Sequence, residues 1–151
     1  MKLRRAKLSD VETMMSLING YAEKGLMLAR SRNILYETIR EFLLMEEENK
    51  IIAVGSLHIL WDDLAEIRAL AVAEDYIGRG VGTKLVNSLI EEARELGCPQ
   101  VFALTYQPEF FKKCGFTLIN KEDMPHKVWK ECIHCVKFPN CDENAMILSL
   151  E

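Results

Sequence analysis

The sequence lacks any long hydrophobic run: no stretch approaches the roughly 18–20 apolar residues that a membrane-spanning helix needs. The basic N-terminus, residues 1–7, is not followed by the apolar segment of a secretory signal peptide. Cysteine is sparse, and its odd number of five does not suit a framework of disulfides. From these absences we expect a cytoplasmic protein that makes no use of a membrane.

Positive charge is also in short supply. With 19 Lys and Arg against 23 Asp and Glu, the formal net charge is −4 at pH 7, whereas a general nucleic-acid-binding protein usually presents a basic face. We therefore expect no nucleic-acid partner, although local charges such as Arg79 and Lys84 suffice for a small anionic ligand. The 151 residues, 49% of them hydrophobic, are enough to bury one core, so residues 1–151 are predicted to form a single domain.

The hydrophobic pattern predicts an α/β (α+β) chain in the order strand, helix, helix, three strands, helix, strand, helix, strand, strand. The first helix is expected to be capped by Ser9 or Asp10. Apolar residues over 35–43 predict the second helix, although residues 42–47 also fit a strand. Further strands are expected at 3–6, 51–60, 65–72, 101–105, 116–119 and 145–150, and further helices at 85–96 and 108–114.

A glycine-rich turn separates the strand over 65–72 from the amphipathic helix that follows. Residues 76–83 read Tyr-Ile-Gly-Arg-Gly-Val-Gly-Thr. Glycine allows the backbone to turn tightly and to approach a ligand closely, and a helix N-terminus binds pyrophosphate through bare N–H groups and the helix dipole. The spacing fits neither the G-x-G-x-x-G fingerprint nor a P-loop. An ordinary strand-to-helix turn is the alternative.

The turn and the order of elements resemble the GNAT superfamily of acyl-coenzyme A-dependent N-acetyltransferases, whose pattern here is [QR]-x-x-G-x-[GA]. Residues 110–116, Phe-Phe-Lys-Lys-Cys-Gly-Phe, resemble that superfamily's later aromatic-x-x-x-Gly-Phe element. The chain departs from the pattern at Ile77, and we expect this to change affinity rather than abolish binding, since the family's pyrophosphate contacts are largely backbone N–H groups. The resemblance implies a GNAT fold, with a mixed, mostly antiparallel sheet flanked by helices, and acetyl-coenzyme A as cosubstrate.

Four segments resemble more narrowly the acetyltransferase domain of N-acetylglutamate synthases: residues 25–31, 65–72, 103–106 and 111–125. This resemblance implies an amino-acid N-acetyltransferase that acetylates the α-amino group of L-glutamate, in arginine biosynthesis. In many of these synthases an amino-acid-kinase-like domain precedes the acetyltransferase domain. Its absence from this sequence suggests a short single-domain form and puts control by arginine in doubt.

Acetyl transfer needs a neutral amine, so a group must take the proton of the amino acid. Glu66 is the predicted general base, because it is the acidic residue on the strand before the turn, where GNAT enzymes often hold such a carboxylate. Desolvation would raise the pKa of this carboxyl and make it a better base; the alternative is a solvent-facing charge. Many GNAT enzymes supply a tyrosine acid where this chain has Phe111, so Tyr106 is a candidate replacement. Direct transfer is preferred to an acetyl-cysteine on Cys114.

The resemblance implies cofactor contacts from Leu70, Ala71 and Val72 to the pantetheine arm, from Gly78, Arg79, Gly80, Val81, Gly82 and Thr83 to the pyrophosphate, and from Phe111. Arg30 and Arg68 are candidate ligands of the substrate carboxylates, because a guanidinium pairs with carboxylates in a bidentate manner. Strand alternation puts Arg68 on the same face as Glu66. A further arginine that the synthases carry near the last strand is absent from residues 140–144, which weakens glutamate specificity; Arg68, Lys127 or Lys130 could substitute.

Residues 124–143 form a cysteine-containing insert before the last strand. Cys132, Cys135 and Cys141, with His126, offer enough ligands for zinc, but a second ligand pair is missing and we assign no metal. Two rival functions stay open: acetylation of another amine, such as a polyamine or a protein N-terminus, and a non-catalytic sensor of acyl-coenzyme A. A homodimer is compatible with either function.

Overall fold

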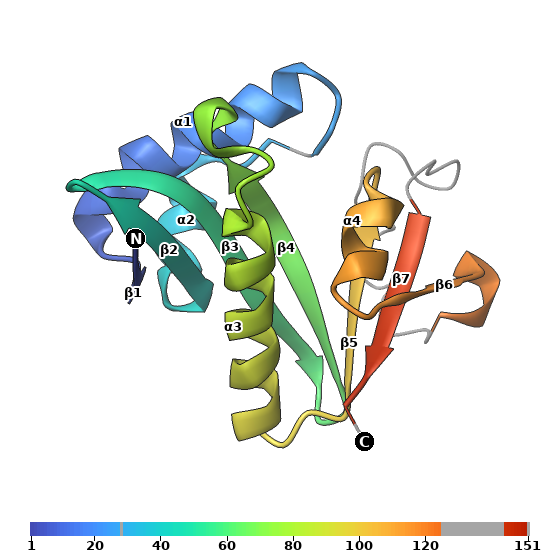
Figure 1. The fold of residues 1–151 in the computed structure, drawn as a ribbon. Coiled ribbons are helices and arrows are strands. Elements are labelled where there is room, and N and C mark those ends of the chain that lie inside the picture. The colour runs from blue at the N-terminus through green and yellow to red at the C-terminus, as the bar shows by residue number, and fades with distance from the viewer. Residues whose placement is uncertain (28, 125–143, 151) are drawn as a thin grey trace.

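The computed structural model describes residues 1–27, 29–124 and 144–150 (Figure 1). Its strands are β1 (Lys2–Arg5), β2 (Phe42–Glu47), β3 (Lys50–Trp61), β4 (Leu64–Val72), β5 (Gln100–Thr105), β6 (Thr117–Ile119) and β7 (Asn144–Ser149), and its helices are α1 (Val11–Glu23), α2 (Arg32–Glu37), α3 (Val81–Glu95) and α4 (Pro108–Lys113). The strands of this described part form one sheet in the order β1-β2-β3-β4-β5-β7-β6. Among them only β4 and β5 pair in parallel. The predicted α/β fold class, with a mixed, mostly antiparallel sheet, is confirmed.

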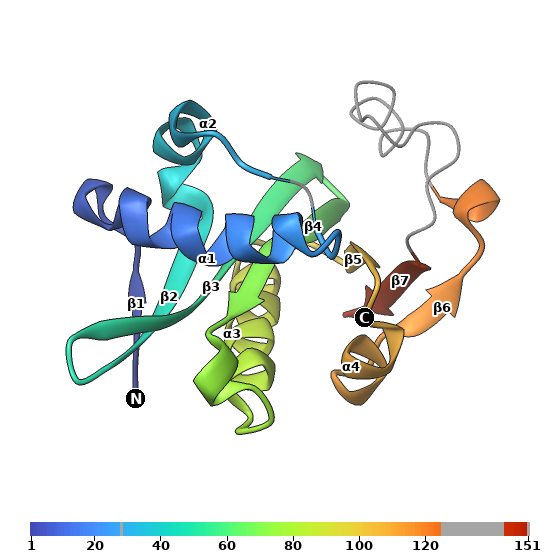
Figure 2. The same ribbon diagram turned by 90° about the horizontal axis from the view of Figure 1, so that it is seen from above.

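Helices cover both faces of the sheet (Figures 1 and 2). α3 packs on one face against β2, β3 and β4, whereas α1 packs on the other face against β3 and β4, with α2 beside it. The side chains of β2 alternate between these two cores: Leu43 and Met45 lie under α3, and Phe42 and Leu44 lie under α1. This period of two is the pattern expected of a strand buried on both faces.

A β-bulge interrupts the middle of β4. Val54 of β3 pairs with Ala71 and Ser56 pairs with Arg68, so two residue steps on β3 face three on β4. Ala69, inside the bulge, has a φ of 53°, a left-handed conformation that is uncommon for a residue with a β-carbon.

The bulge shifts the alternation of β4 by one residue. Before it, Ala65 and Ile67 belong to the core under α3; after it, Leu70 and Val72 pack against that core, and Ala71 belongs to the core under α1. A bulge re-aims side chains in this way because one extra residue is left outside the ladder. In the last third of β4, each side chain therefore points to the face of the sheet opposite to the one that strict alternation would give.

β4 and β5 separate along their length. Their parallel pairing consists of Ala65 with Val101 and Glu66 with Phe102, and Figure 1 shows the two strands diverging from there toward their C-terminal ends. The C-terminal end of β4 leads through the glycine-rich turn into α3. The sheet is therefore opened beside that turn.

The second helix, predicted over residues 35–43, is wrong over its last two thirds. α2 ends at Glu37, a short 3₁₀ turn spans Ile39–Glu41, and Phe42 begins β2. The strand alternative for residues 42–47 is confirmed, because these residues bury their side chains alternately in the two cores.

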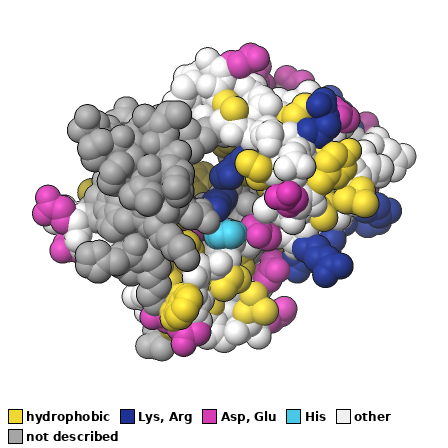
Figure 3. All heavy atoms as spheres, turned by 180° about the vertical axis from the view of Figure 1, so that it is seen from behind, with side chains coloured by type: hydrophobic (Ala, Val, Ile, Leu, Met, Phe, Trp, Pro, Cys, Tyr) yellow, Lys and Arg dark blue, Asp and Glu magenta, His cyan; other side chains and the backbone are white. Residues whose placement is uncertain are grey.

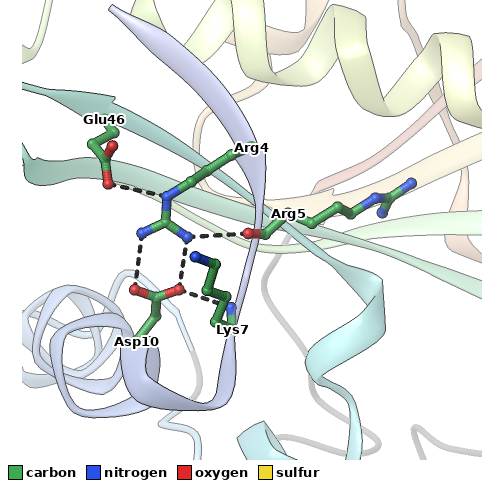
Figure 4. A network of polar contacts seen from close by, with 5 residues as sticks. All are labelled: Arg4, Arg5, Lys7, Asp10 and Glu46. Carbon is green, nitrogen blue, oxygen red and sulfur yellow. Dashed lines mark hydrogen bonds and ion pairs between the residues drawn. The ribbon is translucent and has the colours of Figure 1, made fainter.

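Asp10 precedes α1 but does not cap it with its side chain. Its carboxylate accepts hydrogen bonds from both terminal nitrogens of Arg4, at 2.8 and 2.9 Å, and from the backbone N–H of Lys7 at 2.7 Å (Figure 4). Arg4 Nε also donates to Glu46 of β2 at 3.0 Å. The network joins β1, β2 and the start of α1. The expected cap fails because Ser9 and Asp10 belong to a 3₁₀ turn, Leu8–Asp10, that runs directly into α1. Asp10 has φ and ψ of −89° and −11°, whereas a capping residue is usually extended.

Candidate active site

Glu66 lies at the point where β4 and β5 separate, since its pairing with Phe102 is the last one between those strands. The residue is only 8% exposed, which excludes the alternative of a solvent-facing charge. Its Oε1 accepts a hydrogen bond from Arg68 Nε at 2.5 Å. The expectation that strand alternation puts the two side chains on one face is therefore confirmed. Such a contact stabilises the ionised carboxylate and fixes its direction.

The glycine-rich turn has the backbone geometry that its sequence predicts. Gly78 and Gly80 have φ values of 83° and 80°, and α3 begins directly afterwards, with Gly80 as its N-cap. Lys84 N–H donates to Gly80 C=O at 3.1 Å, whereas the N–H groups that precede it in the first turn have no helical acceptor. Ile77, the departure from the family pattern, is 59% exposed. The turn therefore offers backbone donors at the positive end of a helix.

Two aromatic rings pack beside this turn. A β-carbon on Gly82 would lie 3.2 Å from the ring of Phe110, so the absence of a side chain at Gly82 lets α3 and α4 approach closely. Phe111 packs edge-to-face against Phe110 and Phe116, with ring centroids 5.2 Å apart in both pairs. Phe111 is buried in the core under α3, which leaves it little surface for a ligand, and its assignment to the cofactor stays a prediction.

Cys114 lies next to the same turn, with its thiol hydrogen-bonded to Thr83. Burial raises the pKa of the Cys114 thiol above its ordinary value, and the hydrogen bond with Thr83 offsets part of that rise. The residue is therefore a protonated thiol at neutral pH, and the thiolate is the nucleophilic form. This favours direct transfer over a covalent acetyl-cysteine.

Arg30 is positioned by α1. Its backbone N–H donates to Asn19 Oδ1 at 3.1 Å, and Asn19 Nδ2 donates to its carbonyl at 3.4 Å. Tyr106 is half-buried and directly follows β5. Because β4 and β5 are parallel, Tyr106 lies at the same end of the sheet as the C-terminal end of β4. The structure thus brings Glu66 and Arg68 into contact and places Tyr106 at the open edge beyond them.

His58 is a residue of this site that no sequence motif predicted. It is the register partner of Glu66 on β3, and side chains of directly opposed residues share a face of the sheet. Nδ1 of His58 lies 3.0 and 3.2 Å from the two carboxylate oxygens of Glu41. The available signal was a histidine within a strand that is otherwise almost wholly apolar.

A contact between α1 and the end of β4 was missed as well. The hydroxyl of Tyr21 donates to the carbonyl of Val72 at 2.5 Å, and Lys24 Nζ lies 2.5 Å from a carboxylate oxygen of Glu74. Both contacts fasten the C-terminal end of α1 to the segment between β4 and α3. The loop that carries Arg30 therefore starts from a helix attached to the candidate cofactor strand.

Figure 3 shows a hollow in the face opposite to that of Figure 1, where Lys and Arg side chains and a histidine lie beside acidic ones. Among residues 1–27, 29–124 and 144–150, no cluster of three or more His, Cys, Asp or Glu is arranged to hold a metal ion. The three cysteines and His126 of the insert lie outside these residues. In the same part of the chain no helix has the length and apolar character to cross a membrane.

Comparison with known proteins gives a consistent answer. The model of the Acetyltransferase (GNAT) family matches residues 11–116. An N-acetyltransferase of Chlorobaculum tepidum, itself uncharacterised, is 37% identical over 98% of this chain and 96% of its own length. An amino-acid acetyltransferase of Mycobacterium tuberculosis is 39% identical over 85% of this chain and 75% of its own.

Solved structures agree with these relatives. A Mycobacterium tuberculosis protein in complex with CoA superimposes with a TM-score of 0.88 and 34% identity over the whole of both chains. An N-acetylglutamate synthase of Neisseria gonorrhoeae, complexed with coenzyme A and N-acetyl-glutamate, gives a TM-score of 0.90 and 26% identity over 99% of this chain but 35% of the synthase. The chain belongs to the GNAT family of acetyltransferases, enzymes that take the acetyl group from acetyl-coenzyme A.

Proposed function

We propose that this enzyme transfers the acetyl group of acetyl-coenzyme A to the α-amino group of L-glutamate. The observation that carries the proposal is the buried Glu66–Arg68 pair at the point where β4 and β5 diverge, on the strand that leads into a glycine-rich helix N-terminus. A carboxylate at such a site is suited to take the proton of an attacking amine. Solved relatives with coenzyme A, one of them with N-acetyl-glutamate, support the choice of both substrates.

The cofactor would lie along the open edge of β4. Leu70, Ala71 and Val72 follow the bulge, and pairing between β4 and β5 ends before them. Their backbone groups would bind the pantetheine arm, and the N–H groups of residues 78–83 would bind the pyrophosphate. The thioester would then lie near Glu66, because the two strands meet there.

The amine would attack the thioester carbonyl directly. Glu66 accepts the amine proton, and Arg68 holds the carboxylate ionised and aimed until it does so. Holding the amine and the thioester together supplies much of the acceleration, since it replaces a chance encounter by a fixed geometry. Tyr106, at the open edge, is the proposed donor of a proton to the departing thiolate.

Arg30 is the proposed ligand of a substrate carboxylate. Asn19 holds its backbone on both sides, so the side chain projects from a fixed point. We expect Arg30→Met to raise KM for L-glutamate about 10- to 100-fold, which corresponds to the roughly 1.5–3 kcal/mol of a charged hydrogen bond. KM for acetyl-coenzyme A should stay unchanged. Arg32→Met is the matched control, because Arg32 is exposed and paired with Glu12 on the surface.

The principal test is release of coenzyme A from acetyl-coenzyme A with each free amino acid in turn, for the wild type and for Glu66→Gln. We expect turnover with L-glutamate and a fall in kcat of about 100-fold or more in the variant, the range of general base catalysis. Affinity for acetyl-coenzyme A should be retained. Turnover with a different amine would contradict glutamate as the acceptor, and full activity of Glu66→Gln would remove Glu66 from the mechanism.

A further inference from the structure

Two carboxylates and an imidazole form a row that crosses three segments of the chain. Glu41 comes from the 3₁₀ turn before β2, His58 from β3 and Glu66 from β4. His58 contacts Glu41 through Nδ1 at 3.0 Å and is directly opposite Glu66 in the β3–β4 register. Opposed residues of an antiparallel pair have β-carbons about 4.5–5.5 Å apart. His58 therefore shares a face of the sheet with Glu66, while its ring contacts Glu41.

The contact with Glu41 determines the tautomer of His58. An ionised carboxylate can only accept hydrogen bonds, so Nδ1 carries the proton that it donates to Glu41. In the neutral ring the other nitrogen, Nε2, is then an acceptor.

Glu66 is poorly suited to keep the proton that it receives. Its ionised form accepts the hydrogen bond from Arg68 Nε at 2.5 Å, and protonation removes the negative charge from the Glu66 side of this contact. Because a hydrogen bond between two charged groups is stronger than one to a neutral acid, passing the proton onward restores the stronger contact. A neighbouring acceptor would return Glu66 to that form.

We propose that His58 is that acceptor and that it relays the amine proton from Glu66 to solvent, an inference that rests on the proposed role of Glu66 as base. The proton moves from the amine nitrogen to Glu66, and then to Nε2 of His58 while Nδ1–H stays bonded to Glu41. Water takes the proton from the imidazolium, and Glu66 returns to its carboxylate form beside Arg68. His58 acts through Glu66, so it is a positioning residue rather than a catalytic one.

The surroundings of His58 suit this route to solvent. The side chains of His58 and Glu41 are 23% and 30% exposed, whereas that of Glu66 is 11% exposed. Glu41 from the 3₁₀ turn contacts the imidazole, and on the same face of the sheet Glu66 and Arg68 of β4 contact each other.

The test uses His58→Ala and Glu41→Gln, with Arg40→Gln as the matched control, because Arg40 is an exposed charge on the same turn as Glu41. The single-turnover rate of acetyl transfer is measured in dilute buffer with the amino acid that the wild type acetylates best. For His58→Ala we expect a rate about 10- to 100-fold lower, at the lower end of acid–base catalysis. KM for acetyl-coenzyme A should not change. Added imidazole should restore several-fold of the rate.

Glu41→Gln keeps the shape of the row but removes the charge behind His58, so its rate should fall less and gain little from imidazole. A wild-type rate in His58→Ala overturns the relay, and so does a loss that imidazole does not relieve. If His58→Ala fails to fold, a wild-type rate in Glu41→Gln overturns the proposal. Glu66→Gln separates the two ideas: full activity there refutes the base itself, whereas an inactive Glu66→Gln beside a fully active His58→Ala refutes only the relay.

Discussion

At the scale of single residues, the surroundings of a side chain decide what it can do. Cys114 and Glu66 are both partly removed from water. Within the described residues the anion of Cys114 is stabilised by a hydrogen bond with Thr83, whereas Glu66 contacts the guanidinium of Arg68. Burial without a counter-charge favours the neutral form, and burial beside a cation favours the ionised one. The thiol is therefore a weak nucleophile, and the carboxylate is available to take a proton.

Asp10 supplies a prediction about stability and pH. The hydrogen bonds from Arg4 hold the pKa of the Asp10 carboxyl below its usual range. A lowered pKa in the folded state means that this contribution to the free energy of unfolding is complete above the unfolded-state pKa of about 3.9. It is lost as pH falls through the lower, folded-state value. At pH 7 we expect Asp10→Asn to reduce the free energy of unfolding by about 2 kcal/mol.

The measurement is urea unfolding at several pH values for the wild type and Asp10→Asn. The difference between them should shrink as pH falls below the unfolded-state pKa, because the wild-type carboxyl becomes protonated. Glu12→Gln is the control: Glu12 also bonds an arginine, Arg32, but on the exposed surface, where ion pairs contribute little. A pH-independent difference for Asp10→Asn would show that the network acts by packing rather than charge.

Single residues also mark the limit of what the sequence predicts. Alternation along β4 is enough to place Glu66 and Arg68 on one face, and the contact at 2.5 Å confirms this. The pairing of His58 with Glu66 depends on the register between β3 and β4, and register is set by the bulge and the turn rather than by local pattern. A lone histidine in an apolar strand therefore gave no indication of its neighbours.

At the scale of elements, the glycine-rich turn is the feature that local sequence predicts best. Three glycines before an amphipathic helix predict a tight turn, and Gly78 and Gly80 have the left-handed φ values that favour glycine. The bulge in β4 is different, because Ala69 adopts its φ of 53° without being glycine. The sequence contains one signal of the bulge: after Arg68 the alternation of polar and apolar residues stops.

Two glycines allow the cost of this conformation to be measured. An added β-carbon would meet nothing within 4 Å at either Gly20 or Gly80, but only Gly80 has a positive φ, of 80°. We expect Gly80→Ala to lower the free energy of unfolding by about 1–2 kcal/mol, the cost of a left-handed conformation. Gly20→Ala, inside α1, should raise it by roughly 0.5–1 kcal/mol, because alanine is the better helix former.

Chemical denaturation of both variants, with acetyl-coenzyme A binding measured by calorimetry, checks this pair. Gly80→Ala should also weaken cofactor binding, because the turn must distort to relieve the strain, whereas Gly20→Ala should bind like the wild type. Equal effects of the two substitutions on stability would contradict the role assigned to the turn. Unchanged binding in Gly80→Ala would separate the turn from the cofactor.

At the scale of the whole molecule, two parts of the sheet share the core under α3 but are joined by little backbone pairing. β1 to β4, with α1, α2 and α3, form one part, and β5, β7 and β6, with α4, form the other. The pairing between them is confined to Ala65–Val101 and Glu66–Phe102. Element order was enough to predict the overall architecture. The divergence of β4 and β5 was not predicted, because it depends on packing between segments that are far apart in the sequence.

A ligand that bridges the two parts should stabilise the molecule as a whole. We expect coenzyme A at about 100 times its Kd to add roughly 2.7 kcal/mol to the free energy of unfolding, with a matching rise in Tm. Because the proposed site lies between β4 and β5, hydrogen exchange should slow on both sides of the opening, at Leu70–Val72 and at the end of β5, as well as at the start of α3. Glu66→Gln should show the same protection, since its carboxylate is assigned to the chemistry and not to cofactor binding. Slower hydrogen exchange at α3 alone would mean that the ligand binds the glycine-rich turn without spanning β4 and β5. The placement of the thioester beside Glu66 would then be wrong.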